Sequence, residues 1–97
     1  MVVISWATLR DFYQIHADAK TALEEWYDTV DEADWSNLSD IKQTFNSVDY
    51  VGNDRYVFNI KGNKYRLVAL IFFKSRTVFI RFVGTHAAYD KINVSKI

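Results

Sequence analysis

The spacing of apolar side chains predicts helices in the first half of the chain. Within residues 8–16, apolar and aromatic side chains recur at steps of three and four residues, which is the helical period. A longer apolar stripe with acidic residues around it predicts a second helix, which Asp18 could cap. The stripe consists of Ala22, Leu23, Trp26, Tyr27, Val30 and Ala33. A short strand is expected at residues 2–4, and a shorter helix beginning at Ser39 or Asp40 and ending at Phe45.

From residue 48 onward the pattern becomes typical of β-strands. Three segments are rich in aromatic and β-branched side chains and are predicted as strands: 55–60, 64–73 and 77–83. Gly62-Asn63 suits a two-residue hairpin turn, and a second turn is placed at Ser75-Arg76. Gly84 is expected to end the last strand. Thr85 can then cap a short C-terminal helix.

Strand alternation assigns the residues of these hairpins to two faces. One face holds no charge and must be covered, and the helices are the available cover. It carries Tyr56, Phe58, Ile60, Tyr65, Leu67, Ala69, Ile71, Phe73, Val78, Ile80 and Phe82. The other face carries Arg55, Asn59, Lys61, Lys64, Arg66 and Arg81, interspersed with Val57, Val68, Leu70, Phe72, Phe79 and Val83. In this register Leu70 lies opposite Arg81.

The predicted fold is therefore of the α+β class. It is an antiparallel β-sheet with the N-terminal helices packed on one face and a short C-terminal helix, in a single domain of residues 1–97. The composition agrees, because 49% of the 97 residues are hydrophobic, which excludes a disordered chain. There is no cysteine, which excludes disulfides and thiol chemistry. No segment resembles a membrane span or a signal peptide, and a cytoplasmic location with no membrane contact is expected.

The net charge of zero conceals an uneven distribution. Residues 1–50 carry three Lys or Arg against ten Asp or Glu, a net charge of −7, while residues 51–97 carry nine against two, a net charge of +7. Like charges gathered on one sheet face repel. Phosphates would offset this repulsion by charge-assisted hydrogen bonds, so the basic face indicates an anionic partner. The alternative is a solvated basic surface that the acidic half neutralises within one fold.

Two further residues of the last helix could carry chemistry. His86 and Tyr89 are three residues apart and so lie on one side of it. Histidine is suited to proton transfer near neutral pH, although a hydrogen-bonded structural histidine would give the same sequence signal. His16 continues an apolar stripe and is the weaker candidate. The sequence shows no metal-ligand spacing, no phosphate-binding glycine loop and no nucleophile-elbow motif, so no metal or cofactor is expected.

Two segments resemble a known family. Asn59-Ile-Lys-Gly-Asn-Lys-Tyr-Arg66-Leu-Val and Ile80-Arg81-Phe-Val-Gly-Thr-His86-Ala-Ala-Tyr89-Asp90-Lys-Ile are similar to motifs of the HigB toxins of bacterial type II toxin–antitoxin systems. These toxins belong to the RelE-like mRNA interferases, and the resemblance covers almost the whole chain. It implies a RelE-like fold and an endoribonuclease that cuts messenger RNA in the ribosomal decoding site and so stops translation.

The resemblance also implies a mechanism and a partner. The RNA 2′-hydroxyl would attack the adjacent phosphate without a metal ion or other cofactor, leaving a 2′,3′-cyclic phosphate and a 5′-hydroxyl. The partner would be a HigA-like helix-turn-helix antitoxin that neutralises the toxin. That antitoxin represses the shared operon, so operator DNA would be contacted only through it.

Carried over by position, the resemblance gives each basic residue a role. Arg66 and Arg81 would clamp the scissile phosphate and stabilise its developing charge. His86 would be the general acid or base, with Tyr89 stacking on a base or sharing proton transfer. The remaining RNA- and phosphate-binding candidates are Arg55, Asn59, Lys61 and Lys64. The chain departs from the family pattern at Ala88 and Asn93, where polar and acidic residues respectively are common.

Two other functions fit the same basic face. One is a non-catalytic RNA- or ribosome-binding module, which would block translation without creating new RNA ends. The other is an interaction domain whose basic sheet docks an acidic protein.

Overall fold

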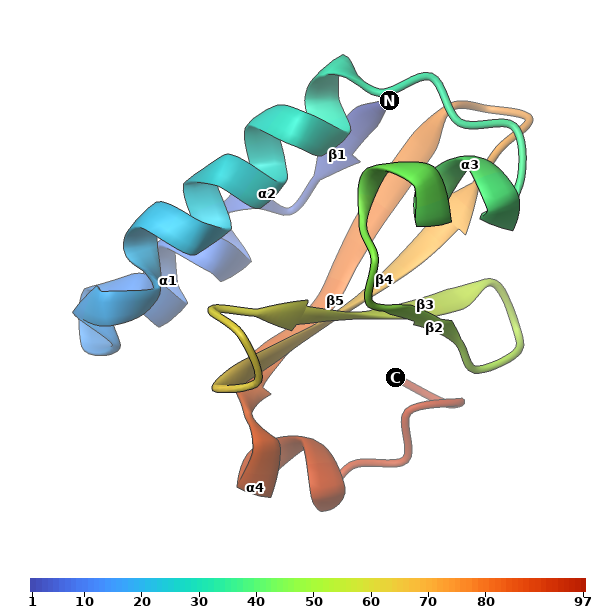
Figure 1. The fold of residues 1–97 in the computed structure, drawn as a ribbon. Coiled ribbons are helices and arrows are strands. Elements are labelled where there is room, and N and C mark those ends of the chain that lie inside the picture. Colours follow the sequence, from blue (N-terminus) through green and yellow to red (C-terminus); the bar gives the residue numbers. More distant parts are fainter.

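A mixed five-stranded sheet organises the chain, which a computed structural model describes from residue 1 to residue 97 (Figure 1). The elements in chain order are β1 (Val2–Ile4), α1 (Trp6–Ile15), the 3₁₀ turn η1 (Ala17–Ala19), α2 (Lys20–Glu32), α3 (Leu38–Thr44), β2 (Val48–Tyr50), β3 (Arg55–Ile60), β4 (Tyr65–Phe72), β5 (Thr77–Thr85) and α4 (His86–Asp90). The strands lie in the order β1-β5-β4-β3-β2. This arrangement confirms the predicted α+β class.

The sheet is antiparallel from β2 to β5, but β1 runs parallel to β5 at the edge. A hairpin forces its two strands to run antiparallel, and no hairpin joins β1 to β5. The sheet is therefore mixed, where the sequence predicted only antiparallel pairs. No helix is long and apolar enough to cross a membrane.

The predicted apolar stripes form the core between the helices and one sheet face. Leu9 of α1 and Leu23, Trp26 and Val30 of α2 are buried against the sheet. Two predicted helix starts need correction. α3 begins at Leu38, before the predicted Ser39 or Asp40, because the Asn37 side chain caps it by accepting a hydrogen bond from the Asp40 amide at 3.0 Å. Asp18 caps no helix, because its carboxylate binds side chains of β4 and of the loop before it.

The β3–β4 register is the predicted one, with Asn59 opposite Arg66. The β4–β5 register differs, because Phe72 pairs with Thr77 and a β-bulge interrupts β5 next to Arg81. Leu70 consequently lies opposite Phe79 and not opposite Arg81. One extra residue in a strand reverses the alternation beyond it.

The bulge exchanges the faces of two residues. Phe82 pairs with Val68 on the side away from α1 and α2, while Val83 packs against the core. The prediction placed both residues on the opposite faces. The strand also continues past Gly84, where a Cβ atom would lie 2.6 Å from Cζ of Phe82. Glycine thus leaves room for the Phe82 ring over the backbone, and any larger residue would force that ring to move.

The sheet face away from α1 and α2 is not open over its whole length. Figure 1 shows α4 and the last residues of the chain on this side. Val57 and Val68 belong to this face and are only 3% and 0% exposed. The chain end is held there, because Arg55 Nε donates to the main-chain oxygen of Ile97 at 2.8 Å. The predicted basic face is therefore partly covered.

Candidate functional site

Arg66 lies at the centre of the candidate site. It occupies β4 opposite Gly84 of β5, and its guanidinium lies over the Tyr89 ring, 4.8 Å from the ring centroid. α4 places Tyr89 there because the Thr85 side chain accepts a hydrogen bond from the Ala88 amide at 3.1 Å and turns the helix back over the sheet. A cation over an aromatic face is attracted by the ring quadrupole. Arg66 and Tyr89 therefore form one unit built from β4 and α4.

His86 is the first residue of α4, the helix that carries Tyr89. It follows Thr85, which pairs with Tyr65, the residue next to Arg66. His86 Nε2 and Arg66 Nε are both buried, and neither has a hydrogen-bond partner within the chain. Buried polar atoms without partners are uncommon and cost free energy. The arrangement thus favours a ligand that carries hydrogen-bonding groups at this position.

The arginines of this face also lack acidic partners. The ion pairs of the chain involve Arg10, Lys61, Lys64 and Arg76. Arg66 and the exposed Arg81 are in none of them. Their charges are therefore available to an external anion.

Asn59 lies beside this site on β3, and its amide donates to the Ser47 hydroxyl. Arg55 lies at the other end of β3, four residues away or about 13 Å along the strand. Its guanidinium is engaged by the main-chain oxygens of Ile97 and Asn53. The structure therefore groups Asn59, but not Arg55, with Arg66.

Lys61 and Lys64 point toward the helical layer, contrary to the predicted placement on the basic face. Both belong to the β3–β4 loop, where Lys61 and Gly62 have φ values of 53° and 64° and strand alternation has ended. Lys61 Nζ donates to the main-chain oxygen of Asp18 at 3.1 Å, and Lys64 Nζ binds its carboxylate. The two ammonium groups are thus paired with Asp18.

Asp18 fastens this loop to η1. Its carboxylate also accepts a hydrogen bond from the hydroxyl of the buried Tyr65 at 2.5 Å. The bond from Lys64, followed by that from Tyr65, holds the pKa of Asp18 well below its usual range. The same carboxylate raises the pKa of Lys64 and of Tyr65. Asp18 thereby fixes the position of the residue that precedes Arg66.

Replacing Asp18 with asparagine should lower the thermal midpoint at neutral pH. A carboxyl whose pKa is lower in the folded than in the unfolded chain stabilises the fold above its unfolded pKa of about 4, and this contribution is lost as the pH falls toward the folded pKa. The difference between the two proteins should therefore shrink below about pH 4. Thermal melts from neutral to acidic pH measure it. Asp28→Asn, an exposed acid of α2, is the control and should show no such trend.

The model of one protein family, described as HigB_toxin, RelE-like toxic component of a toxin-antitoxin system, matches residues 19–92. The chain belongs to the HigB toxin family. This confirms the resemblance seen in the sequence. The matched residues include Arg66, Arg81, His86 and Tyr89.

Several curated relatives of this HigB-family chain are similar over nearly their whole length. The mRNA interferase toxin HigB of Escherichia coli (strain K12) is 34% identical over 93 residues, which cover 93% of this chain and 88% of the relative. The mRNA interferase HigB of Shigella flexneri has the same identity and coverage. The mRNA interferase HigB of Escherichia coli O6:H1 (strain CFT073) is 29% identical over 94 residues, 95% of this chain and 91% of the relative.

Sequence reasoning missed two features of the site of this HigB-family chain. Asp18 gave no sign of contact with β4, because it lies 47 residues before Tyr65. The close approach of Phe82 to Gly84 had a weak signal, namely a glycine at the end of a strand-like run.

Proposed function

We propose that this HigB-family chain cleaves messenger RNA on the ribosome by acid–base chemistry that requires no metal ion. Its family makes it the toxic component of a toxin–antitoxin system. The relatives named mRNA interferases give it the activity of an mRNA-cleaving endoribonuclease. The observation that carries the mechanism is that two nitrogens are buried and unpartnered: Arg66 Nε, whose guanidinium lies over the Tyr89 ring, and His86 Nε2, on the same helix as Tyr89.

In the proposed reaction the RNA 2′-hydroxyl oxygen attacks the adjacent phosphorus and the bond to the 5′-oxygen breaks. A proton leaves the 2′-hydroxyl and another reaches the departing 5′-oxygen. His86 moves one of these protons. Arg66, with Arg81, donates hydrogen bonds to the non-bridging oxygens, on which negative charge develops. The products are a 2′,3′-cyclic phosphate and a 5′-hydroxyl.

The remaining residues hold the substrate in this proposal. Tyr89 orients the Arg66 guanidinium and offers a surface on which a base can stack. Asn59 lies close enough to Arg66 to bind the same RNA segment. Lys61, Lys64 and Arg55 would reach phosphates only by exchanging their present partners, Asp18 and the chain end. They are therefore auxiliary contacts to neighbouring phosphates.

The proposal includes a setting for the reaction. The chain acts in the cytoplasm, where a HigA-like helix-turn-helix antitoxin neutralises it and messenger RNA is presented in the decoding site. The partner antitoxin and the RNA substrate follow from membership of a toxin–antitoxin family. The partly covered basic face suits a short single-stranded segment, such as a message held in the decoding site.

Mapping of RNA 5′ ends tests the proposed function. The chain is expressed in bacterial cells without an antitoxin, and the ends of cellular messages are sequenced with and without phosphorylation of 5′-hydroxyls. New ends that appear only after phosphorylation, within translated regions, are the expected result. Arrest of translation without new ends would establish the alternative, a non-catalytic ribosome- or RNA-binding module. Ends outside translated regions would contradict the requirement for the ribosome.

A further inference from the structure

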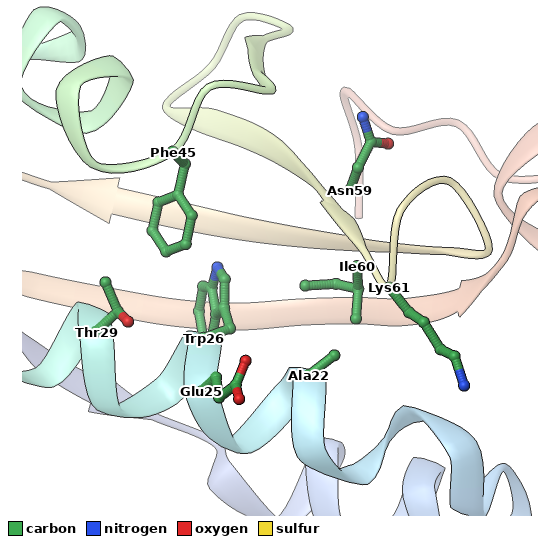
Figure 2. Close-up of a pocket in the computed structure, with 8 residues that line it drawn as sticks. All are labelled: Ala22, Glu25, Trp26, Thr29, Phe45, Asn59, Ile60 and Lys61. Carbon is green, nitrogen blue, oxygen red and sulfur yellow. The ribbon is translucent and has the colours of Figure 1, made fainter.

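A pocket opens on the helical side of the sheet, and its lining reaches Asn59, the residue that pairs with Arg66 on β4. It has a volume of about 340 Å³ and opens between α2 and the end of β3 (Figure 2). Phe45 and Ile60 supply apolar walls, while Glu25 and Thr29 project from α2 at its rim. We call it the α2–β3 groove. It is concave and combines apolar with polar groups, as binding sites do.

Trp26 supplies the feature that distinguishes this groove from a packing defect. Its side chain is 3% exposed, and its indole Nε1–H has no hydrogen-bond partner. Figure 2 shows the indole nitrogen pointing away from α2, between Phe45 and Ile60. By contrast, Trp35 Nε1, also in a buried residue, donates to the Thr44 hydroxyl at 3.1 Å. Buried indole N–H groups usually find an acceptor, so Trp26 indicates a ligand with a carbonyl or similar oxygen.

The charge around the groove determines the class of ligand. Glu25 is the acid that lines the groove, and it takes part in no ion pair within the chain. Lys61 also lines the groove, but its ammonium group is paired with Asp18. The uncompensated charge of the groove is therefore negative, which attracts cations and disfavours phosphate. A protein segment with Lys or Arg side chains fits the charge.

We propose that the α2–β3 groove is a docking site for a basic–apolar segment of the antitoxin. The segment inserts one apolar side chain between Phe45 and Ile60 and gives an oxygen to Trp26 Nε1. It also places a Lys or Arg beside Glu25. Since Nε1 is fully covered in the free chain, the inserted group must part the side chains around it. The proposal rests on the chain being the toxin of a toxin–antitoxin pair, and not on its cleavage chemistry.

Two substitutions test the groove in growth assays. Thr29→Arg fills it with a long side chain that α2 accommodates, and Glu25→Lys reverses its charge. Both variants should still arrest growth when expressed alone, but co-expressed antitoxin should no longer restore growth. Asp31→Lys makes the same charge change on an exposed position of α2 that does not line the groove, and should remain neutralised. Restored growth for both groove variants would overturn the proposal.

Direct binding separates this proposal from the proposed function. The toxin is co-expressed with tagged antitoxin, and the amount of toxin that co-purifies is measured for each variant. The dissociation constant of each refolded toxin for the antitoxin is then determined. Each groove variant should bind at least about tenfold more weakly than the unsubstituted chain, and Asp31→Lys should bind equally well. The binding measurement tests the docking site whether or not the chain arrests growth. Equal affinity of a folded groove variant would contradict the docking site.

The chemical shifts of the indole N–H groups test the contact independently, in a chain whose groove residues are unchanged. The chain has three tryptophans, so a ¹⁵N-labelled sample shows three indole N–H signals, and Trp26→Phe assigns one of them. Addition of unlabelled antitoxin should shift the Trp26 signal downfield, as a new hydrogen bond does. The Trp35 signal should change little because its bond to Thr44 already exists. An unchanged Trp26 signal in the saturated complex would overturn the proposed contact.

Discussion

Replacing Arg66 with alanine should reduce cleavage of messenger RNA by about 100- to 1,000-fold, the usual cost of removing a donor that stabilises developing charge. Arg66 is the arginine over the Tyr89 ring, has a buried unpartnered Nε, and takes part in no ion pair. Its loss removes both the positive charge and the directed N–H groups. The rate is measured as the appearance of new 5′ ends per unit of toxin, together with relief of growth arrest.

Two matched variants show whether the loss of cleavage comes from the guanidinium of Arg66. Arg66→Lys keeps the charge but not the planar donors, and should retain only part of the activity. Arg10→Ala removes an exposed arginine of α1 and should cleave at the unsubstituted rate. Thermal melts of all three establish that they fold. A folded Arg66→Ala chain with full activity would rule out Arg66 as the phosphate clamp.

Replacing His86 with glutamine should lower cleavage by about 100- to 10,000-fold, which is the range for loss of a general acid or base. Glutamine keeps a side chain that can donate and accept hydrogen bonds, but it cannot transfer a proton at neutral pH. A purely structural histidine would therefore be replaced with little loss, whereas a proton-transferring one would not. The measurement is the cleavage rate under conditions where the thermal midpoint is unchanged.

The other histidine of the chain provides the control for this prediction. His16 stacks on Phe12 at 4.4 Å and lies near Tyr65 on the helical side of the sheet. His16→Gln should leave the cleavage rate unaltered. In the His86→Ala variant, added imidazole should restore part of the activity by supplying the missing group. Retained activity in His86→Gln would assign the proton transfer to another group, with Tyr89 of the same helix as the next candidate.

The arrangement of the core could be predicted from the sequence because it depends on local periodicity. Leu23, Trp26 and Val30 recur at helical spacing, and all three are buried. Tyr56, Phe58 and Ile60 alternate along β3 and lie in the same core. Burial of a whole face is enough to determine which side of each element points inward.

The candidate site could be predicted only in part. Arg66, His86 and Tyr89 were identified because they fall in two motif segments, and the structure brings their elements together. Lys61 and Lys64 were misplaced because their partner, Asp18, is distant in sequence. The positions of Phe82 and Val83 were exchanged, since strand alternation does not reveal a bulge.

The sequence by itself determined the α+β class, the inward faces of its helices and strands, and the HigB family, because these depend on periodicity and on motifs within short segments. Only the tertiary structure decided which charges remain free for RNA. Arg66 and Arg81 stay without acidic partners, while Asp18 binds the loop lysines and the chain end binds Arg55. It also left the indole N–H of Trp26, on the acidic helix α2, without a hydrogen-bond partner. Pairing of charges and hydrogen-bonding groups depends on distances across the fold, which no local pattern contains.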